Sequence, residues 1–439
     1  MAALPKSFNL AEPIPTLPDG AMSQIISCRP VSGSQFSQQS IIEIDLPSRG
    51  WLDPKSLSIR YELTGTAAAT NGSAMIGTPL YTPFARLSTL VGGANIETLS
   101  QYNQIAHVIT QTSYDVGTKY GNQLGLGYVL TVDGSLNSLG NMAQLDGRAI
   151  PTPGAFEFSL AGPLLGSVLA NSEKMLPLFA MPQVRLQFTL DSLTNMFFVG
   201  ALTTQSPAYG IPTALTIQNF EVVFNMCDLG AGVERMVYDL GQTVSIKTHG
   251  YTNSAVPIPS ATSGSGSYVF NQRFASIRGA FICPNRADGS GNRWAELVDV
   301  TTNSGDYQLQ IGNQAFPQLP LSTVNNRAGI LQETKRCSNS LYANDAMSIN
   351  SVEFSKNIND AAATLTVGEP GKFISAINLE KIQSGDHVVF SGASTYNTPI
   401  SCIINTATAT TVAATLNLIL DYDAVLVLNP VARQLSVRS

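Results

Sequence analysis

The sequence predicts an all-β protein in which two β-sandwiches follow one another along the chain, with short connecting helices. Only 12% of the 439 residues are charged, against roughly 25% in an average soluble domain. Neutral polar residues, 36 glycines and 24 prolines replace the missing charges, which favours turns and pleated strands over long helices. Apolar and polar residues alternate along many short segments, and the order of these segments repeats in the two halves.

Residues 1–20 are predicted to form an extended N-terminal arm. Pro5, Pro13, Pro15 and Pro18 keep this stretch extended and prevent it from pairing with itself. We therefore expect the arm to be ordered only where it lies against a neighbouring subunit or the inner face of an assembled shell.

The first sandwich is assigned to residues 21–232. Period-two alternation places Ile42, Ile44 and Leu46 on one face of a strand. The same pattern predicts the other strands of this half, at residues 56–64, 156–160, 182–190 and 215–226. The glycines within residues 229–234 mark the boundary between the halves.

The second sandwich is assigned to residues 233–439. Its strands are predicted at residues 243–248, 276–283, 307–312, 387–392, 400–406 and 424–437. The last segment is expected to be one continuous strand, with a bulge or bend at Pro430 because proline cannot donate to a ladder.

Helices and loops are expected only as connections between strands. Apolar residues at helical spacing predict short helices at residues 102–111, 164–175 and 324–336. Small polar residues predict loops at residues 64–74 and 259–267.

The two halves share one order of elements. Residues 90–99 comprise a strand, a glycine turn and a short strand, with a predicted helix directly after them, and residues 310–321 repeat this order. Residues 156–165 and 215–224 have counterparts at residues 372–382 and 416–428. The shared order predicts a duplicated sandwich.

Charge argues against nucleic-acid binding. The formal net charge is −6, and the 24 basic residues are scattered along the chain. The first fifty residues carry Lys6, Arg29 and Arg49 and more acidic than basic side chains, so no basic arm is present to neutralise phosphates. We expect no direct sequence-specific nucleic-acid binding.

The cysteines fit neither a disulfide framework nor a metal clamp. They are odd in number and at least 50 residues apart, so we expect five buried free thiols: Cys28, Cys227, Cys283, Cys337 and Cys402.

Prolines interrupt the N-terminal stretch where a signal peptide needs an apolar run. The most apolar tract, residues 411–430, contains Asn417, Asp421 and Asp423, so no transmembrane span is expected.

No motif carries a recognisable chemistry. A serine hydrolase would need His107, His249 or His387 held by a carboxylate, and no GxSxG elbow is present. His107 is expected to pack or cap within a helix, and His387, beside Asp386, to lie in a turn. HExxH, CxxC and EF-hand patterns are absent, and Asp133–Gly134 and Asp288–Gly289 are typical turn dipeptides.

The remaining candidates also have simpler explanations. Residues 121–127 and 263–267 lack the order of a phosphate-binding loop and are interpreted as loops. The glycosylation-type triplet Asn71–Gly72–Ser73 is interpreted as coincidental, and Trp51 and Trp294 as packing residues. Paired carboxylates of a glycosidase stay open but are disfavoured by the small number of acids. We therefore expect no catalytic, cofactor-binding or metal-ligating residues and no enzymatic activity.

Composition instead favours an assembly protein. The centres of interfaces between protein copies are depleted in Lys, Glu and Asp, so a chain covered by neighbours on several sides can carry few charges. The function is expected to lie in the surfaces of the two sandwiches.

The chain resembles the double jelly-roll major capsid proteins of the PRD1 and adenovirus lineage. Residues 30–65, 87–109 and 172–190 resemble the first half of that family. The resemblance to its second half is carried by residues 273–284, 306–321 and 391–439. Within the family the chain looks closest to the capsid proteins of Polinton-like viruses and virophages, because the basic FFKxVYRRYT-like N-terminal signature of large algal and amoebal viruses is absent.

The resemblance implies a viral major capsid protein made of two tandem eight-stranded jelly rolls. It implies a homotrimer that forms a pseudo-hexagonal capsomer and tiles an icosahedral shell around a double-stranded DNA genome. Implied partners are neighbouring capsomer trimers, penton and minor capsid proteins and, often, an internal membrane. The implied location is the virion, after assembly in the host cytoplasm or nucleus.

Two other classes share this architecture, because a fold does not determine function. They are a spike or receptor-binding protein and a carbohydrate-binding protein or enzyme. The internal duplication favours the capsid interpretation, since two similar halves turn a trimer into a six-sided tile.

Overall fold

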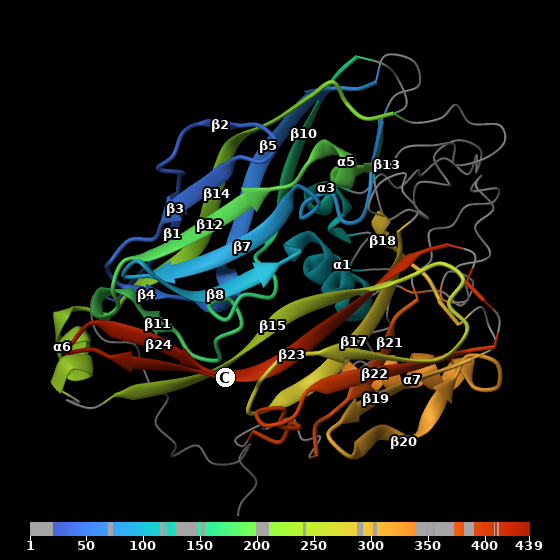
Figure 1. Ribbon diagram of the computed structural model, residues 1–439. Helices are drawn as coiled ribbons and strands as arrows, with labels where there is room; N and C mark the ends of the chain where they lie inside the picture. Colours follow the sequence, from blue (N-terminus) through green and yellow to red (C-terminus); the bar gives the residue numbers. More distant parts are fainter. Residues whose placement is uncertain are drawn as a thin grey trace, which may run out of the picture.

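The protein folds into two β-sandwiches, one drawn above the other in Figure 1. A computed structural model describes residues 21–68, 73–114, 118, 121–127, 148–150, 154–198, 210–239, 243–287, 293–301, 305–338, 349, 354, 373–381, 390–407, 409–410 and 412–439. The predicted all-β architecture with short connecting helices is confirmed for this part of the chain.

The first half contains the longer series of strands. They are β1 (Met22–Cys28), β2 (Gln35–Phe36), β3 (Ile41–Asp45), β4 (Trp51–Leu52), β5 (Ser58–Thr66), β6 (Ser73–Met75), β7 (Phe84–Val91), β8 (Ala94–Ser100), β9 (Arg148–Ile150), β10 (Ala155–Pro163), β11 (Leu176–Pro177), β12 (Val184–Leu190), β13 (Phe197–Phe198) and β14 (Ala214–Asp228). Its helices are η2 (Pro54–Ser56), α1 (Tyr102–Ser113), α3 (Gln123–Leu126), η3 (Leu178–Ala180) and α5 (Leu193–Met196).

The second half follows after helix α6 (Ala231–Asp239). Its strands are β15 (Val244–Ile258), β16 (Gly264–Phe270), β17 (Ile277–Arg286), β18 (Arg293–Leu297), β19 (Asp306–Ile311), β20 (Gln314–Ser322), β21 (Ser375–Asn378), β22 (Ile400–Thr406), β23 (Ala414–Asn429) and β24 (Gln434–Arg438). Helix α7 (Arg327–Cys337) follows β20.

Eight strands of each half pair in the same order. In the first half the two sheets run β1-β14-β5-β10 and β3-β12-β7-β8. In the second half they run β15-β23-β17-β21 and β16-β22-β19-β20. Numbering the eight strands of each half along the chain makes the two pairing orders identical. This match confirms the order of elements predicted from the sequence.

The alternation that predicted the strands follows from burial of one face. Ile42 and Ile44 of β3 and Ile59 and Leu63 of β5 have no exposed surface, whereas their neighbours along each strand are partly exposed. On the outer face of the β3–β12 pair, Arg185 binds the Asp45 carboxylate through Nε, 2.6 Å from Oδ1. Apolar residues therefore fill the sandwich, and polar ones face outward.

The repeated hairpin and helix are confirmed in both halves. The β7–β8 turn uses Gly92 and Gly93, with φ of 58° and 83°, and the β19–β20 turn uses Gly312, with φ of 59°. These left-handed backbone angles suit glycine, which has no Cβ to clash. Helices α1 and α7 follow the two hairpins, as the sequence predicted.

The predicted helix at residues 164–175 is wrong. This segment forms turns, with Gly166 at a φ of 76° and a single helical bond from Asn171 N to Ser167 O. The Ser167 hydroxyl and the Val168 N–H both donate to the buried Glu97 carboxylate. A side chain from β8 thus takes donors that would otherwise be satisfied within a helix.

The predicted continuous strand at residues 424–437 is also wrong. The chain reverses after Asn429, and β24 pairs antiparallel with the end of β23. Pro430 has no N–H for a ladder, Asn429 Oδ1 accepts the Ala432 N–H, and Arg433 adopts a φ of 48°. Together they form a tight turn where we expected a bend.

Other boundaries also differ from the predictions. The loop predicted at residues 259–267 is wrong from Gly264 onward, because these small residues pair with β22. The loop at residues 64–74 contains the end of β5 and the start of β6, and α3 lies within the loop predicted at 121–127. In the strand predicted at 387–392, residues 387–389 lie outside the described residues, and 390–392 are not in a strand.

Candidate functional site

The two sandwiches meet along a seam that is rich in buried polar groups. We define the seam as α1, β8 and residues 166–173 of the first half packed against β15, β17 and β23 of the second (Figure 1). The seam joins the duplicated halves into one body.

Among the described residues, side-chain hydrogen bonds cross the seam at three places. Asn253 Nδ2 donates to Gln101 Oε1 and Gln104 Oε1, at 2.6 and 3.0 Å. The Thr248 hydroxyl donates to Val168 O at 2.6 Å. Asn171 Nδ2 donates to His249 O at 3.0 Å. The bonds of Asn253 anchor the start of α1 to strand β15, and the other two anchor the turns of residues 166–173 to the same strand.

Trp294 provides the main aromatic contact between the halves. It comes from β18 and is 3% exposed, and its indole Nε1 donates to Asn195 O of the first half at 2.8 Å. Its ring meets His107 of α1 edge-on, with centroids 5.8 Å apart. A side chain at Gly77 would collide with the same ring. Trp294 is therefore a packing residue, as predicted.

Glu97 is a buried acid on the first-half side of the seam. It is 6% exposed and accepts hydrogen bonds from Ser167 Oγ (2.9 Å), Val168 N (3.0 Å) and Thr89 Oγ1 (3.4 Å). Burial raises the pKa of Glu97 from 4.5 to about 7, although these donors favour the ionised form. Val168 also accepts a hydrogen bond at its carbonyl from the hydroxyl of Thr248, which belongs to the second half. Val168 therefore connects Glu97 of the first half to strand β15 of the second.

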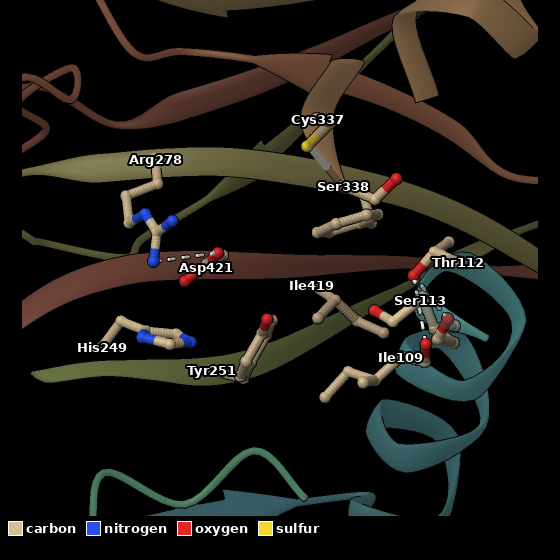
Figure 2. A pocket seen from close by; sticks show the side chains of 12 residues that line it. Ile109, Thr112, Ser113, His249, Tyr251, Arg278, Cys337, Ser338, Ile419 and Asp421 are labelled. Atoms are coloured by element: carbon tan, nitrogen blue, oxygen red, sulfur yellow. Dashed lines mark hydrogen bonds and ion pairs between the residues drawn. The ribbon is translucent and has the colours of Figure 1, made fainter. Parts of the chain in front are cut away.

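A small cavity of about 110 Å³ lies beside this network, between the end of α1 and strands β15, β17 and β23 (Figure 2). Arg278 and Asp421 meet at its edge, with 3.9 Å between Nη1 and Oδ2, and Arg278 Nε also lies 3.1 Å from Glu380 Oε1. Burial raises the pKa of Asp421 to about 6, against the opposing effect of Arg278. Burial lowers the pKa of His249 to about 3, with Arg278 adding to the effect.

This cavity does not resemble an active site. His249 is held neutral, and no hydrogen bond is found from its ring to a carboxylate among the described residues. Burial also raises the pKa of the Cys337 thiol at the cavity wall, which disfavours the reactive thiolate. Arg278 pairs with Asp421 and Glu380, whereas Asp421 Oδ1 is buried without a hydrogen-bond partner among the described residues. These groups are not arranged as a nucleophile and its base.

The structure scatters the other candidate residues. His107 is buried in α1, with Nδ1 3.4 Å from Thr78 Oγ1, and packs as predicted. Trp51 is partly buried against Phe179, with ring centroids 5.4 Å apart. The following candidates lie outside the described residues: Asp386, His387, Asp133–Gly134, Asp288–Gly289 and Asn71–Gly72.

The described part of the chain contains no group of three or more His, Cys, Asp and Glu side chains placed to hold a metal ion. None of its helices is both long enough and apolar enough to cross a membrane.

All five cysteines are free thiols. Cys283 and Cys402 are buried, but Cys28, Cys227 and Cys337 are only partly so, and full burial was wrongly predicted for these three. Burial raises the pKa of Cys28 to about 11 and that of Cys402 to about 12.

We expect alkylation of the denatured protein to count five thiols. In the native protein at pH 8 we expect slow alkylation, with Cys283 and Cys402 reacting last. A count below five would contradict the assignment.

Comparisons with known proteins give a consistent result at the level of structure. No model of a protein family matches the chain, and no curated protein sequence matches it. Among solved structures, a chain in the cryo-EM structure of the Sputnik virophage is 13% identical, with a TM-score of 0.60 and coverage of 100% of this chain and 92% of that one. The PBCV-1 capsid gives 12% identity, a TM-score of 0.59 and coverage of 97% and 98%.

The mavirus major capsid protein gives 9% identity, a TM-score of 0.57 and coverage of 100% of this chain and 95% of that one. These neighbours are double jelly-roll proteins, and the match spans both sandwiches. The chain has the double jelly-roll fold. The predicted resemblance to virophage capsid proteins is thereby confirmed at the level of structure, at identities where the sequences retain little in common.

The double jelly-roll fold explains why the strands could be predicted from the sequence and the contacts between the halves could not. Each jelly roll is the eight-strand unit described above, and the seam is where the two units join. The sequence contained the strands but not the seam. Glu97, Thr248 and Asn253 are ordinary strand residues in the sequence, and their partners lie 71, 80 and up to 152 residues away.

Proposed function

We propose that this double jelly-roll protein is a viral major capsid protein. The observation that carries the proposal is the duplication of one eight-strand order in both halves, combined with a seam that locks the halves into one body. Two equivalent jelly rolls per chain give a trimer six similar sides, which suits a hexagonal tile. The chain's low charge and the solved capsid structures of the same fold agree with this role.

The remaining parts of the proposal concern assembly. Trimers would form pseudo-hexagonal capsomers of an icosahedral shell around double-stranded DNA, and the protein would reside in the virion. Its partners would be neighbouring capsomers, penton and minor capsid proteins and an internal membrane where the virus has one. Its role would be structural, with neither catalysis nor direct DNA binding. We assign residues 1–20 to an arm, 21–232 to the first jelly roll and 233–439 to the second.

Native mass measurement tests the proposal directly. We expect the purified protein to form trimers of about 140 kDa, three times the 46.6 kDa of one chain, or multiples of them. Electron micrographs of the same sample should show six-lobed particles. A spike or carbohydrate-binding protein has no need of pseudo-sixfold particles, so a clean monomer at micromolar concentration would contradict the capsid proposal.

A further inference from the structure

A groove of about 520 Å³ lies at one end of the seam, next to the C-terminal hairpin. One wall is the β7–β8 turn with Val91, and the other is formed by β23 and β24 with Val427 and Leu435. Pro182 and Thr243 also line it. Figure 1 shows β24 running beside β8 at this end of the molecule. The groove is thus built by both jelly rolls.

Its charge is unusual for this chain. Arg433 and Arg438 line the groove, and none of the described residues that line it is acidic. Both arginines are exposed, and neither forms an ion pair within the described part of the protein. Arg433 is held at a φ of 48°, an uncommon angle for a residue with a side chain. In a protein of net charge −6, this groove is a basic and partly apolar surface without an acidic partner.

We propose that the groove binds the chain's own N-terminal segment, around the sequence Leu-Ala-Glu-Pro-Ile-Pro-Thr-Leu-Pro at residues 10–18. The segment carries Glu12 as its only charge, with Asp19 just after it, and its other residues are apolar or neutral. Pro13, Pro15 and Pro18 hold it extended before it binds, which reduces the entropy lost on docking.

The start of the described chain lies near enough for this assignment. Met22 of β1 pairs with Asp228, and α6 begins three residues later. Helix α6 packs on η3, where the Tyr238 hydroxyl donates to Phe179 O at 3.1 Å. Both connections end in the groove, since Pro182 follows η3 and Thr243 follows α6.

The reach of the segment matches the longest possible distance to the groove. The path from Asp228 to Thr243 spans at most about 35 Å, because α6 rises only about 1.5 Å per residue and the remaining steps extend by about 3.3 Å each. Glu12 lies ten residues before Met22, the ladder partner of Asp228, and an extended chain of that length also spans about 35 Å. Attachment to the same chain also gives the segment a high effective concentration at the groove, which favours it over the arm of a second copy.

Hydrogen exchange on the full-length chain tests the proposal. We expect the amides of residues 433–438 to exchange at least tenfold more slowly in the native sequence than in a Glu12→Lys/Asp19→Lys variant. Arg433→Glu/Arg438→Glu should lose the same protection. Combining the four substitutions should restore it, because the charges are exchanged across the contact. The matched control is Lys55→Glu/Arg60→Glu, the same change of charge at exposed residues outside the groove.

The outcomes separate the possible occupants. Protection that is restored in the charge-exchanged chain supports the proposal. Refolding the Glu12→Lys/Asp19→Lys and Arg433→Glu/Arg438→Glu chains together identifies the source of the arm, because only an acidic arm from a second copy can then reach a basic groove. Protection of residues 433–438 in this mixture would overturn the assignment to the same chain. Equal exchange in the native and Glu12→Lys/Asp19→Lys proteins would overturn the docking itself. These outcomes hold for a monomer and for a trimer, so the capsid proposal is tested separately.

Discussion

Ending the chain after Asp423 is expected to abolish soluble folding. The truncation removes the last third of β23, including Leu426 and Leu428, which have no exposed surface, and all of β24. It also leaves residues Val244–Thr248 of β15 without their ladder partners. Each buried leucine contributes about 1.5–3 kcal/mol, and the lost ladder adds to this, against a net stability of about 5–15 kcal/mol for a domain. Solubility and cooperative melting of the purified protein measure the effect.

A second truncation, after Asn429, is the matched control. It removes only the turn and β24, whose Leu435 and Val437 are partly buried and whose other residues are exposed. We expect this protein to remain soluble and to melt cooperatively at a temperature lowered by several degrees. Val431 is removed in both truncated proteins and is 68% exposed, so it does not account for a difference in stability between them. A soluble, cooperatively melting protein ending at residue 423 would contradict the core position of β23.

Alternation made most strands predictable because each sandwich buries one face of every strand. The β22 strand at Ile400–Thr406 matches the prediction at both ends, since Ile400, Cys402 and Ile404 are buried and their neighbours are not. The glycine turns at Gly92 and Gly312 were predictable for a different reason, because a positive φ has a residue-specific cost. Both features depend only on residues that are close together in the sequence, so they can be predicted from it.

Two of the errors have the opposite cause, because in them a distant group overrides a local preference. Apolar spacing at residues 164–175 favours a helix, but Glu97, about 70 residues earlier, takes the donors of Ser167 and Val168. The Gly264–Ser267 stretch has loop composition, yet the neighbouring strand β22 supplies a ladder for it. The contacts between the two halves were not predicted, since nothing around Trp294 in the sequence indicates that its indole donates to Asn195 O. The repeated order of strands and helices predicted two sandwiches but not the residues that join them.

Glu97 should make the stability of the seam depend on pH. Its pKa rises from 4.5 to about 7 on folding, so its neutral form stabilises the fold below pH 4.5, and this contribution is lost as pH rises through 7. Asp421 acts in the same direction, with a pKa raised from 3.8 to about 6. His249 acts in the opposite direction, because its lowered pKa costs stability as pH falls below 6.5. Measurements on the native protein alone would therefore mix the three effects.

Comparison with Glu97→Gln isolates the acid. Glutamine keeps the size and one acceptor oxygen but cannot ionise, so the difference in unfolding free energy between the two proteins reports Glu97 alone. We expect that difference to shift by roughly 3 kcal/mol against the native protein between pH 4.5 and pH 8, from a pKa change of about 2.5 units. Urea unfolding across this range measures it, with Glu157→Gln at an exposed position of β10 as the control. A difference that stays constant with pH would mean that the carboxyl bonded to Val168 does not gain a proton on folding, and that the seam tolerates a buried charge at every pH.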